Sequence, residues 1–262
     1  MALAGLKARL AFAFSLLALT VPTLAHADVD ASKTKASKAA ASEFTVLAKG
    51  SENSGNAPRA SDPKAKKLLD TIFDDSDVVN SKSVSFDALT PLSERMRAGI
   101  ETAIVYMLAG TGVSDLGQIA SVPDGEVKVN LNVIKFAPEM GRFYDFQLHV
   151  QSAIAEAIAT KLATGNRMEI AKQNFQSGLA QVRGGSQRVL SGVIETLAVN
   201  GISDDWRRDR MAALTGSAVS MSKILEAEQK KQLQDLARAC ADVMDDASVK
   251  KGLEDFAVKI GG

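Results

Sequence analysis

A seven-residue pattern over residues 166–200 constrains the fold of this chain more than any other feature of its sequence. A large apolar residue recurs every seven positions, and a small residue follows three positions after each one. The large residues are Met168, Phe175, Val182 and Val189, and the small ones are Ala171, Gly178, Gly185 and Gly192. Residues three or four apart share one face of a helix. The pattern therefore predicts a long helix with a flat stripe for close packing.

The segment before this helix is the neighbour that we expect against the stripe. Residues 138–165 carry apolar side chains at helical spacing, and Asn166 can cap the helix that follows. Because the loop between the two helices is short, they should be antiparallel neighbours. Gly184 and Gly185 offer an alternative, a break in the second helix, since each interior glycine costs about 1 kcal/mol relative to alanine. We expect a continuous, bent helix over 166–200.

Residues 1–27 have the features of a secretory signal peptide. Lys7 and Arg9 precede an apolar run over residues 10–19, and small residues lead to a cleavage position after Ala27. We therefore expect export to the periplasm or beyond the cell. No later apolar run is long enough to span a membrane, so we expect no transmembrane segment after cleavage.

Charge and cysteine content narrow the possible partners. Lys and Arg number 31, the same as Asp and Glu, and loss of the leader would leave a small acidic excess. A nucleic-acid-binding domain shows a basic surface instead, so we expect no nucleic-acid partner. Cys240 is the single cysteine, which excludes an internal disulfide. Its apolar neighbours predict that it is buried.

Residues 28–62 are rich in Ala, Ser, Lys, Gly and Asn, with few large apolar side chains. Such a segment buries too little apolar area to offset its conformational entropy, so we expect a disordered, low-complexity linker. Its excess of lysine leaves open a second role, a weak electrostatic contact with an anionic envelope surface.

Residues 63–262 are expected to form one mostly α domain, an antiparallel helical bundle with a small two-stranded β element. The β element is predicted from a change in the apolar pattern, from helical spacing to a period of two residues. Apolar residues at 127, 129, 131 and 133 alternate with polar ones, which is typical of a half-buried strand. Ser83–Phe86 alternates in the same way and is its expected partner. Because two isolated strands are only marginally stable, the pair should lie against helices.

Catalytic and metal chemistry find little support in the sequence. His149 is the one histidine beyond the expected leader, and Asp145 lies one turn before it. The two could form a base with its orienting acid, but we favour a solvated ion pair. Asp74, Asp75 and Asp77 lack the glycine and distal glutamate of a calcium loop, so we expect a solvated acidic turn. With no nucleotide, hydrolase or metalloprotease motif either, we expect no catalytic residue, no metal and no cofactor.

One candidate binding site is a cluster of guanidiniums beside an indole, formed by Trp206, Arg207, Arg208 and Arg210. Such a cluster could bind a phosphate, a carboxylate or a partner protein. Asp204 and Asp205 lie within one helical turn, however, and could neutralise it locally. We favour structural salt bridges with a packed Trp206 over anion or partner binding.

The second candidate is a polar strip within the apolar face of residues 138–165. Tyr144, Gln147 and Gln151 lie there within two turns. They could line a groove for a small molecule or a peptide. They could equally form a buried hydrogen-bonded set, because unpaired buried polar groups cost about 1–3 kcal/mol each.

Together these features favour a non-catalytic protein of the cell envelope. We expect a scaffold, chaperone-like or adaptor role in which helix surfaces contact another envelope protein or a second copy. The alternative is a small-molecule or peptide binding module with the Tyr144, Gln147 and Gln151 groove as its site.

Overall fold

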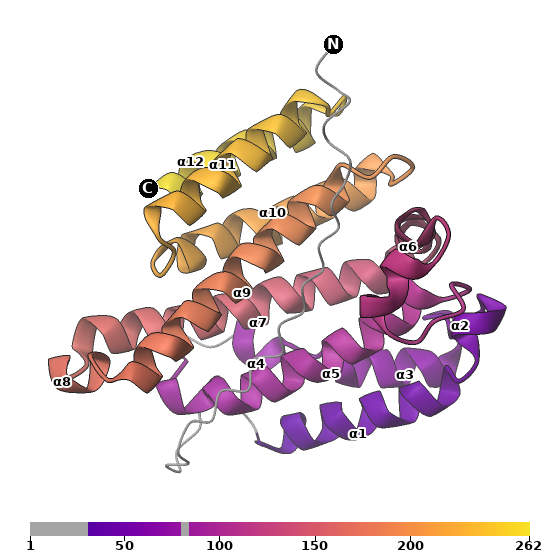
Figure 1. The fold of residues 1–262 in the computed structure, drawn as a ribbon, viewed down its shortest axis with the longest axis horizontal. Coiled ribbons are helices and arrows are strands. Elements are labelled where there is room, and N and C mark those ends of the chain that lie inside the picture. Colours follow the sequence, from indigo (N-terminus) through magenta and orange to yellow (C-terminus); the bar gives the residue numbers. More distant parts are fainter. Residues whose placement is uncertain (1–30, 80–83) are drawn as a thin grey trace.

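The computed structural model describes residues 31–79 and 84–262, and every regular element in these ranges is a helix (Figure 1). The expected signal peptide, residues 1–27, lies outside them. None of the described helices is both long and apolar enough to cross a membrane. The elements are α1 (Ala31–Leu47), α2 (Ser51–Ser54), α3 (Pro63–Ile72), α4 (Ser76–Val79), η1 (Phe86–Ala88), α5 (Leu89–Leu108), η2 (Leu116–Ser121), α6 (Gly125–Lys135), α7 (Ala137–Thr164), α8 (Arg167–Ile170), α9 (Gln173–Leu197), α10 (Asp204–Ser222), α11 (Ala227–Asp242) and α12 (Ala247–Gly261).

Helix α7 is the centre of the fold. It packs against α5 on one side and against α9 and α10 on the other. In Figure 1, α1, α3 and α5 lie below it, and α11 and α12 lie at the top. Its buried side chains come from around the helix, including Phe143, Phe146, Val150 and Ile154. A helix that is apolar on several faces must be covered on several sides, which explains this position.

The pairing of α7 with α9 confirms the expected antiparallel neighbours. Tyr144 accepts a hydrogen bond from Thr196 at 3.1 Å, and Gln151 donates one to Ser186 at 3.0 Å. From the first contact to the second, the residue number increases along α7 and decreases along α9, so the two helices run antiparallel. Helix α9 is continuous through Gly184 and Gly185, and Gly185 is buried.

The break in the 166–200 segment lies elsewhere, at 171–172, between α8 and α9. Asn166 caps α8, its side chain accepting a hydrogen bond from the Met168 amide at 2.9 Å. Ala171 and Met168 are exposed, so the first repeat of the pattern does not contribute to packing. Only the later repeats, from Val182 onward, lie in the core.

The expectation of a disordered linker is wrong for residues 31–62, because they contain α1 and α2. Helix α1 packs against α3 and α5. Phe44 is fully buried and lies 5.7 Å from the Tyr106 ring. Further along, the Tyr106 hydroxyl donates to the Pro58 carbonyl at 2.8 Å, and the Ala60 amide donates to Glu139 at 2.7 Å. One large anchor and closely packed alanines are enough, since alanine is the best helix former and lets helices approach closely.

The expected two-stranded β element is also wrong, because the described residues contain no strand. Phe86 begins the short η1, and the alternating stretch from Val127 forms α6. Ser83 lies outside the described residues. Asn132, on the inward face of α6, donates to the carbonyls of Met107 and Ala109 at 2.9 and 2.7 Å. These bonds satisfy free carbonyls at the end of α5, and tertiary contacts of this kind override the local period.

Candidate functional site

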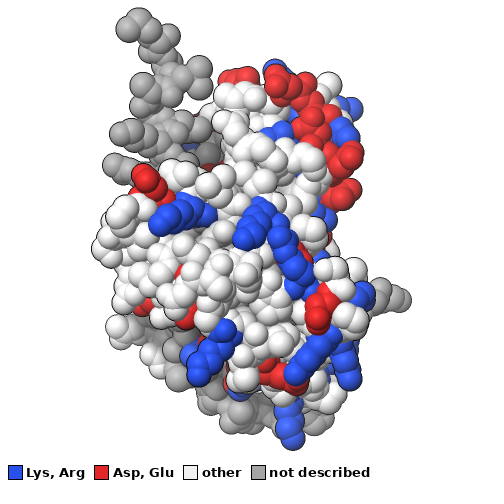
Figure 2. Space-filling model, turned by 90° about the vertical axis from the view of Figure 1, so that its right-hand side faces the viewer, with Lys and Arg blue, Asp and Glu red and all other residues white. Residues whose placement is uncertain are grey.

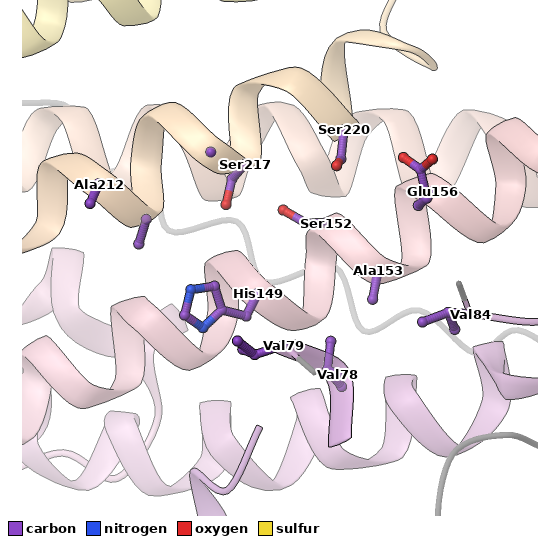
Figure 3. A pocket seen from close by; sticks show the side chains of 12 residues that line it. Val78, Val79, Val84, His149, Ser152, Ala153, Glu156, Ala212, Ser217 and Ser220 are labelled. Carbon is purple, nitrogen blue, oxygen red and sulfur yellow. The ribbon is translucent and has the colours of Figure 1, made fainter. Parts of the chain in front are cut away.

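A groove of about 300 Å³ opens between α4, α7 and α10 (Figure 3). Its walls combine aliphatic, small and hydroxyl-bearing side chains with one imidazole. The lining residues that matter below are Val78, Val84, His149, Ser152, Gly216 and Ser217. Figure 3 shows the Ser152 and Ser217 hydroxyls directed into the space between α7 and α10.

The acidic turn (Asp74, Asp75 and Asp77) holds α4 in place as one wall of this groove. Each of the three carboxylates pairs with a basic side chain from a different helix. Asp74 lies 2.7 Å from the Lys33 ammonium of α1, and Asp75 lies 2.6 Å from Nδ1 of His149 of α7. Asp77 pairs at 2.8 Å with Arg95 of α5, which also donates to the Asp74 carbonyl. The expected solvated turn is therefore an anchored one.

Arg95 is the most deeply buried of these basic residues, with 1% of its side chain exposed. It donates to both carboxylate oxygens of Asp77, at 2.8 and 3.1 Å. A guanidinium fits a carboxylate in this two-bond geometry, which fixes orientation as well as charge. Arg95 therefore ties α5 to the segment that carries α4.

The charges around His149 perturb several pKa values. The hydrogen bond to Asp75 raises the pKa of His149 above its ordinary value, against the opposing effect of burial. Burial alone would raise the pKa of Asp74, but hydrogen bonds from Lys33 and Ser76 outweigh it and lower this pKa to about 2. Burial also raises the pKa of Asp145, although Arg210 beside it opposes the shift. Asp145 pairs with Arg210 at 2.8 Å, so it is not the partner of His149 that the sequence suggested.

The Asp75–His149 pair has the geometry of an acid that orients a base. A hydrolytic triad also needs a nucleophile bonded to the imidazole. Within residues 31–79 and 84–262, no hydrogen bond joins His149 to Ser152, Ser217 or another hydroxyl. The same ranges contain no cluster of three His, Cys, Asp or Glu side chains that could hold a metal ion.

The Trp206 and arginine cluster is occupied by the chain itself. The Trp206 indole donates to the Ala137 carbonyl at 2.8 Å, and Arg210 lies over its ring, 5.2 Å from the centroid. Arg207 donates to the carbonyls of Leu197 and Val199 at the end of α9, at 2.8 and 3.1 Å. Arg208 pairs with two aspartates, Asp205 and Asp246. These bonds join α7, α9, α10 and α12 and leave no open cluster of guanidiniums.

The strip of Tyr144, Gln147 and Gln151 is buried and does not line the groove. Gln151 donates to Ser186, and burial raises the pKa of Tyr144 to about 12. The strip therefore corresponds to the buried, register-setting alternative, for Tyr144 and Gln151 at least. Cys240 is buried as expected, and burial raises the pKa of its thiol to about 11.

Apart from His149, sequence reasoning missed the groove residues, although one signal was available. Ala212, Gly216 and Ser220 are small residues four positions apart, so they share one face of α10. His149 and Ser152 lie one turn apart on the facing helix. This pattern did not indicate a binding site, because small and polar residues on one face of a helix usually face solvent.

A second candidate surface is the outward face of α6. Val127 and Leu131 lie one turn apart, with 56% and 58% of their surface exposed. The side of the molecule that carries α6 in Figure 1 is shown in Figure 2, where broad uncharged areas separate the Lys and Arg side chains. Acidic side chains are most frequent toward the upper right of that view, where Lys and Arg side chains lie among them.

Protein-family models, curated proteins and solved structures give no match to this chain, so only the geometry of its own residues bears on function.

Proposed function

We propose that this chain is an exported, non-catalytic helical protein of the cell envelope that acts as a scaffold or adaptor. In this proposal, the outward face of α6, defined by Val127 and Leu131, is where a partner protein docks. The sequence of residues 1–27 supports export, because it has the order of regions that a signal peptidase reads.

The exposed apolar pair on α6 carries the proposal. The inward face of the helix is already complete, with Val129 and Val133 buried and Asn132 bonded to the end of α5. Val127 and Leu131 lie on the other side and add nothing to the core. A helix at the edge of a bundle normally carries polar residues there. Single exposed apolar residues need no explanation, but two that adjoin on one helix form the start of a contact surface.

Support for a non-catalytic role comes from the pairing of the charged groups near the groove. His149 is held by Asp75, and Asp145 is held by Arg210. Catalytic acids and bases need access to a reacting atom, and His149 has no bonded nucleophile among the described residues.

The test places a photocrosslinking residue at Val127 or Leu131 of the full chain in cells that express and export it. The matched control is Val258 on α12, which is even more exposed, at 71%. We expect a discrete crosslinked species from positions 127 and 131 and none from 258. Its mass identifies a second copy or another envelope protein. Equal labelling at all three positions, or none, would contradict the proposal.

A second arm keeps the photocrosslinking residue at position 131 and adds Val127→Lys. This variant should fold with unchanged unfolding temperature, because Val127 is exposed, yet lose the crosslink. A folded variant that keeps the crosslink would refute docking through this face.

A further inference from the structure

The groove between α4, α7 and α10 contains a glycine that packing does not explain. Glycine is a poor helix former, so an interior helical glycine usually makes room for a neighbour. A methyl group added at Gly99 would lie 2.8 Å from Phe146, and one at Gly252 would lie 2.7 Å from Met211. At Gly216, inside α10, an added methyl group would meet no atom within 4 Å. Its missing side chain leaves space in the groove itself.

Ser152 supplies an unused polar group to the same space. A helical serine commonly donates to the carbonyl four residues earlier, here Leu148. That carbonyl instead accepts a hydrogen bond from Ser217 of α10 at 3.4 Å. The Ser152 hydroxyl oxygen is buried and has no hydrogen-bond partner in the described structure. A buried hydroxyl without a partner is costly, and a ligand in the groove would satisfy it.

The charges around the groove determine what kind of ligand fits. Glu156 pairs with Lys223 at 2.6 Å, His149 pairs with Asp75, and Asp145 pairs with Arg210. Each of these side chains is therefore already engaged by an acidic or basic partner. An ionic ligand would therefore bring an uncompensated charge into a partly buried site, which is unfavourable.

We propose that this groove binds a small uncharged ligand that carries an amide or hydroxyl group next to a short aliphatic group. The polar group lies against Ser152 and Ser217, and the aliphatic group packs against Val78 and Val84. A volume of about 300 Å³ is at the lower end for small-molecule sites, which limits the ligand to a small molecule or a single peptide unit. This site is separate from the α6 face and does not depend on it.

The test titrates the full chain with three probes built on valine, of which the first two are equal in size and the third lacks the acetyl group. N-acetyl-L-valinamide is neutral, N-acetyl-L-valine is an anion at neutral pH, and L-valinamide is a cation. Binding is followed by chemical-shift changes at groove residues. We expect saturable binding of the neutral probe and at least tenfold weaker binding of both ions. No saturable shift with the neutral probe at millimolar concentration, or tighter binding of an ion, overturns the proposal.

Two variants locate the binding. Gly216→Leu fills the open space and should weaken binding of the neutral probe at least tenfold. Gly184→Leu is its control, because Gly184 is an interior glycine of α9 outside the groove, where an added methyl group meets only the flexible end of Arg188. Ser152→Ala removes one atom and should also weaken binding severalfold, which keeps the test decisive if Gly216→Leu does not fold. Unchanged affinity in the folded groove variants refutes the site.

Discussion

Replacing Arg95 by methionine tests how the acidic turn is anchored. Arg95 is 1% exposed and makes two hydrogen bonds to Asp77, whose side chain is 14% exposed. Removing one partner of a buried ion pair costs about 3–5 kcal/mol, because the other charge stays buried without compensation. Asp77 keeps a weaker contact with Lys33 at 3.6 Å. We therefore expect a loss near the lower limit, about 3 kcal/mol.

The measurement is the free energy of unfolding from urea titration, followed by helical circular dichroism. A domain of ordinary stability, about 5–15 kcal/mol, would show such a loss as a clear shift of the midpoint. Arg97→Met is the matched control on the same helix. Arg97 is exposed and pairs with Glu101 one turn away, so its loss should cost only about 0.3–0.5 kcal/mol.

The double variant Arg95→Met with Asp77→Leu separates charge from packing. If the unpaired carboxylate causes the loss, the second substitution should restore much of the stability. A loss below about 1 kcal/mol in Arg95→Met, or one equal to that of Arg97→Met, would refute the buried anchor.

Three further predictions address other parts of the molecule. Phe44→Ala should lower the free energy of unfolding by about 3–5 kcal/mol, because it empties a fully buried site between α1 and α5; a change near zero would mean that α1 does not belong to the cooperative unit. Gly216→Ala should raise the free energy of unfolding by about 0.5–1 kcal/mol, since the methyl group meets no neighbour; destabilisation in the same urea assay would contradict this. His149→Asn should remove one pH-dependent contribution to stability. Asp75 raises the pKa of His149 in the folded chain, so protonated His149 stabilises the fold fully below the unfolded value of about 6.5 and loses this effect as the pH rises through the folded value. The difference between wild type and variant, measured from about pH 5 to 9, should therefore shrink with pH, and a constant difference would argue against the Asp75–His149 bond.

The binding clusters show why residue type did not determine role. Trp206 and the arginines next to it have the composition of an anion site, yet their partners come from α7, α9 and the α11–α12 turn. Asp145 and His149 are one turn apart on α7, but each pairs with a residue that is distant in sequence, Arg210 and Asp75 respectively. Spacing along one helix shows which side chains adjoin, and it does not show which helix packs against them.

Short-range patterns in the sequence predict that residues 63–262 are mostly helical, that α7 and α9 pair antiparallel, and that Asn166 caps a helix, where its side chain accepts a hydrogen bond from the Met168 amide. These features depend on short-range spacing and on groups within one turn. Contacts between helices, by contrast, make Val127–Val133 a helix and order residues 31–54. In residues 127–133 the local helical preference is weak, and in α1 the alanines favour a helix but bury little apolar area. In both segments the deciding energy comes from contacts distant in sequence, such as Asn132 with the end of α5 and Phe44 with Tyr106.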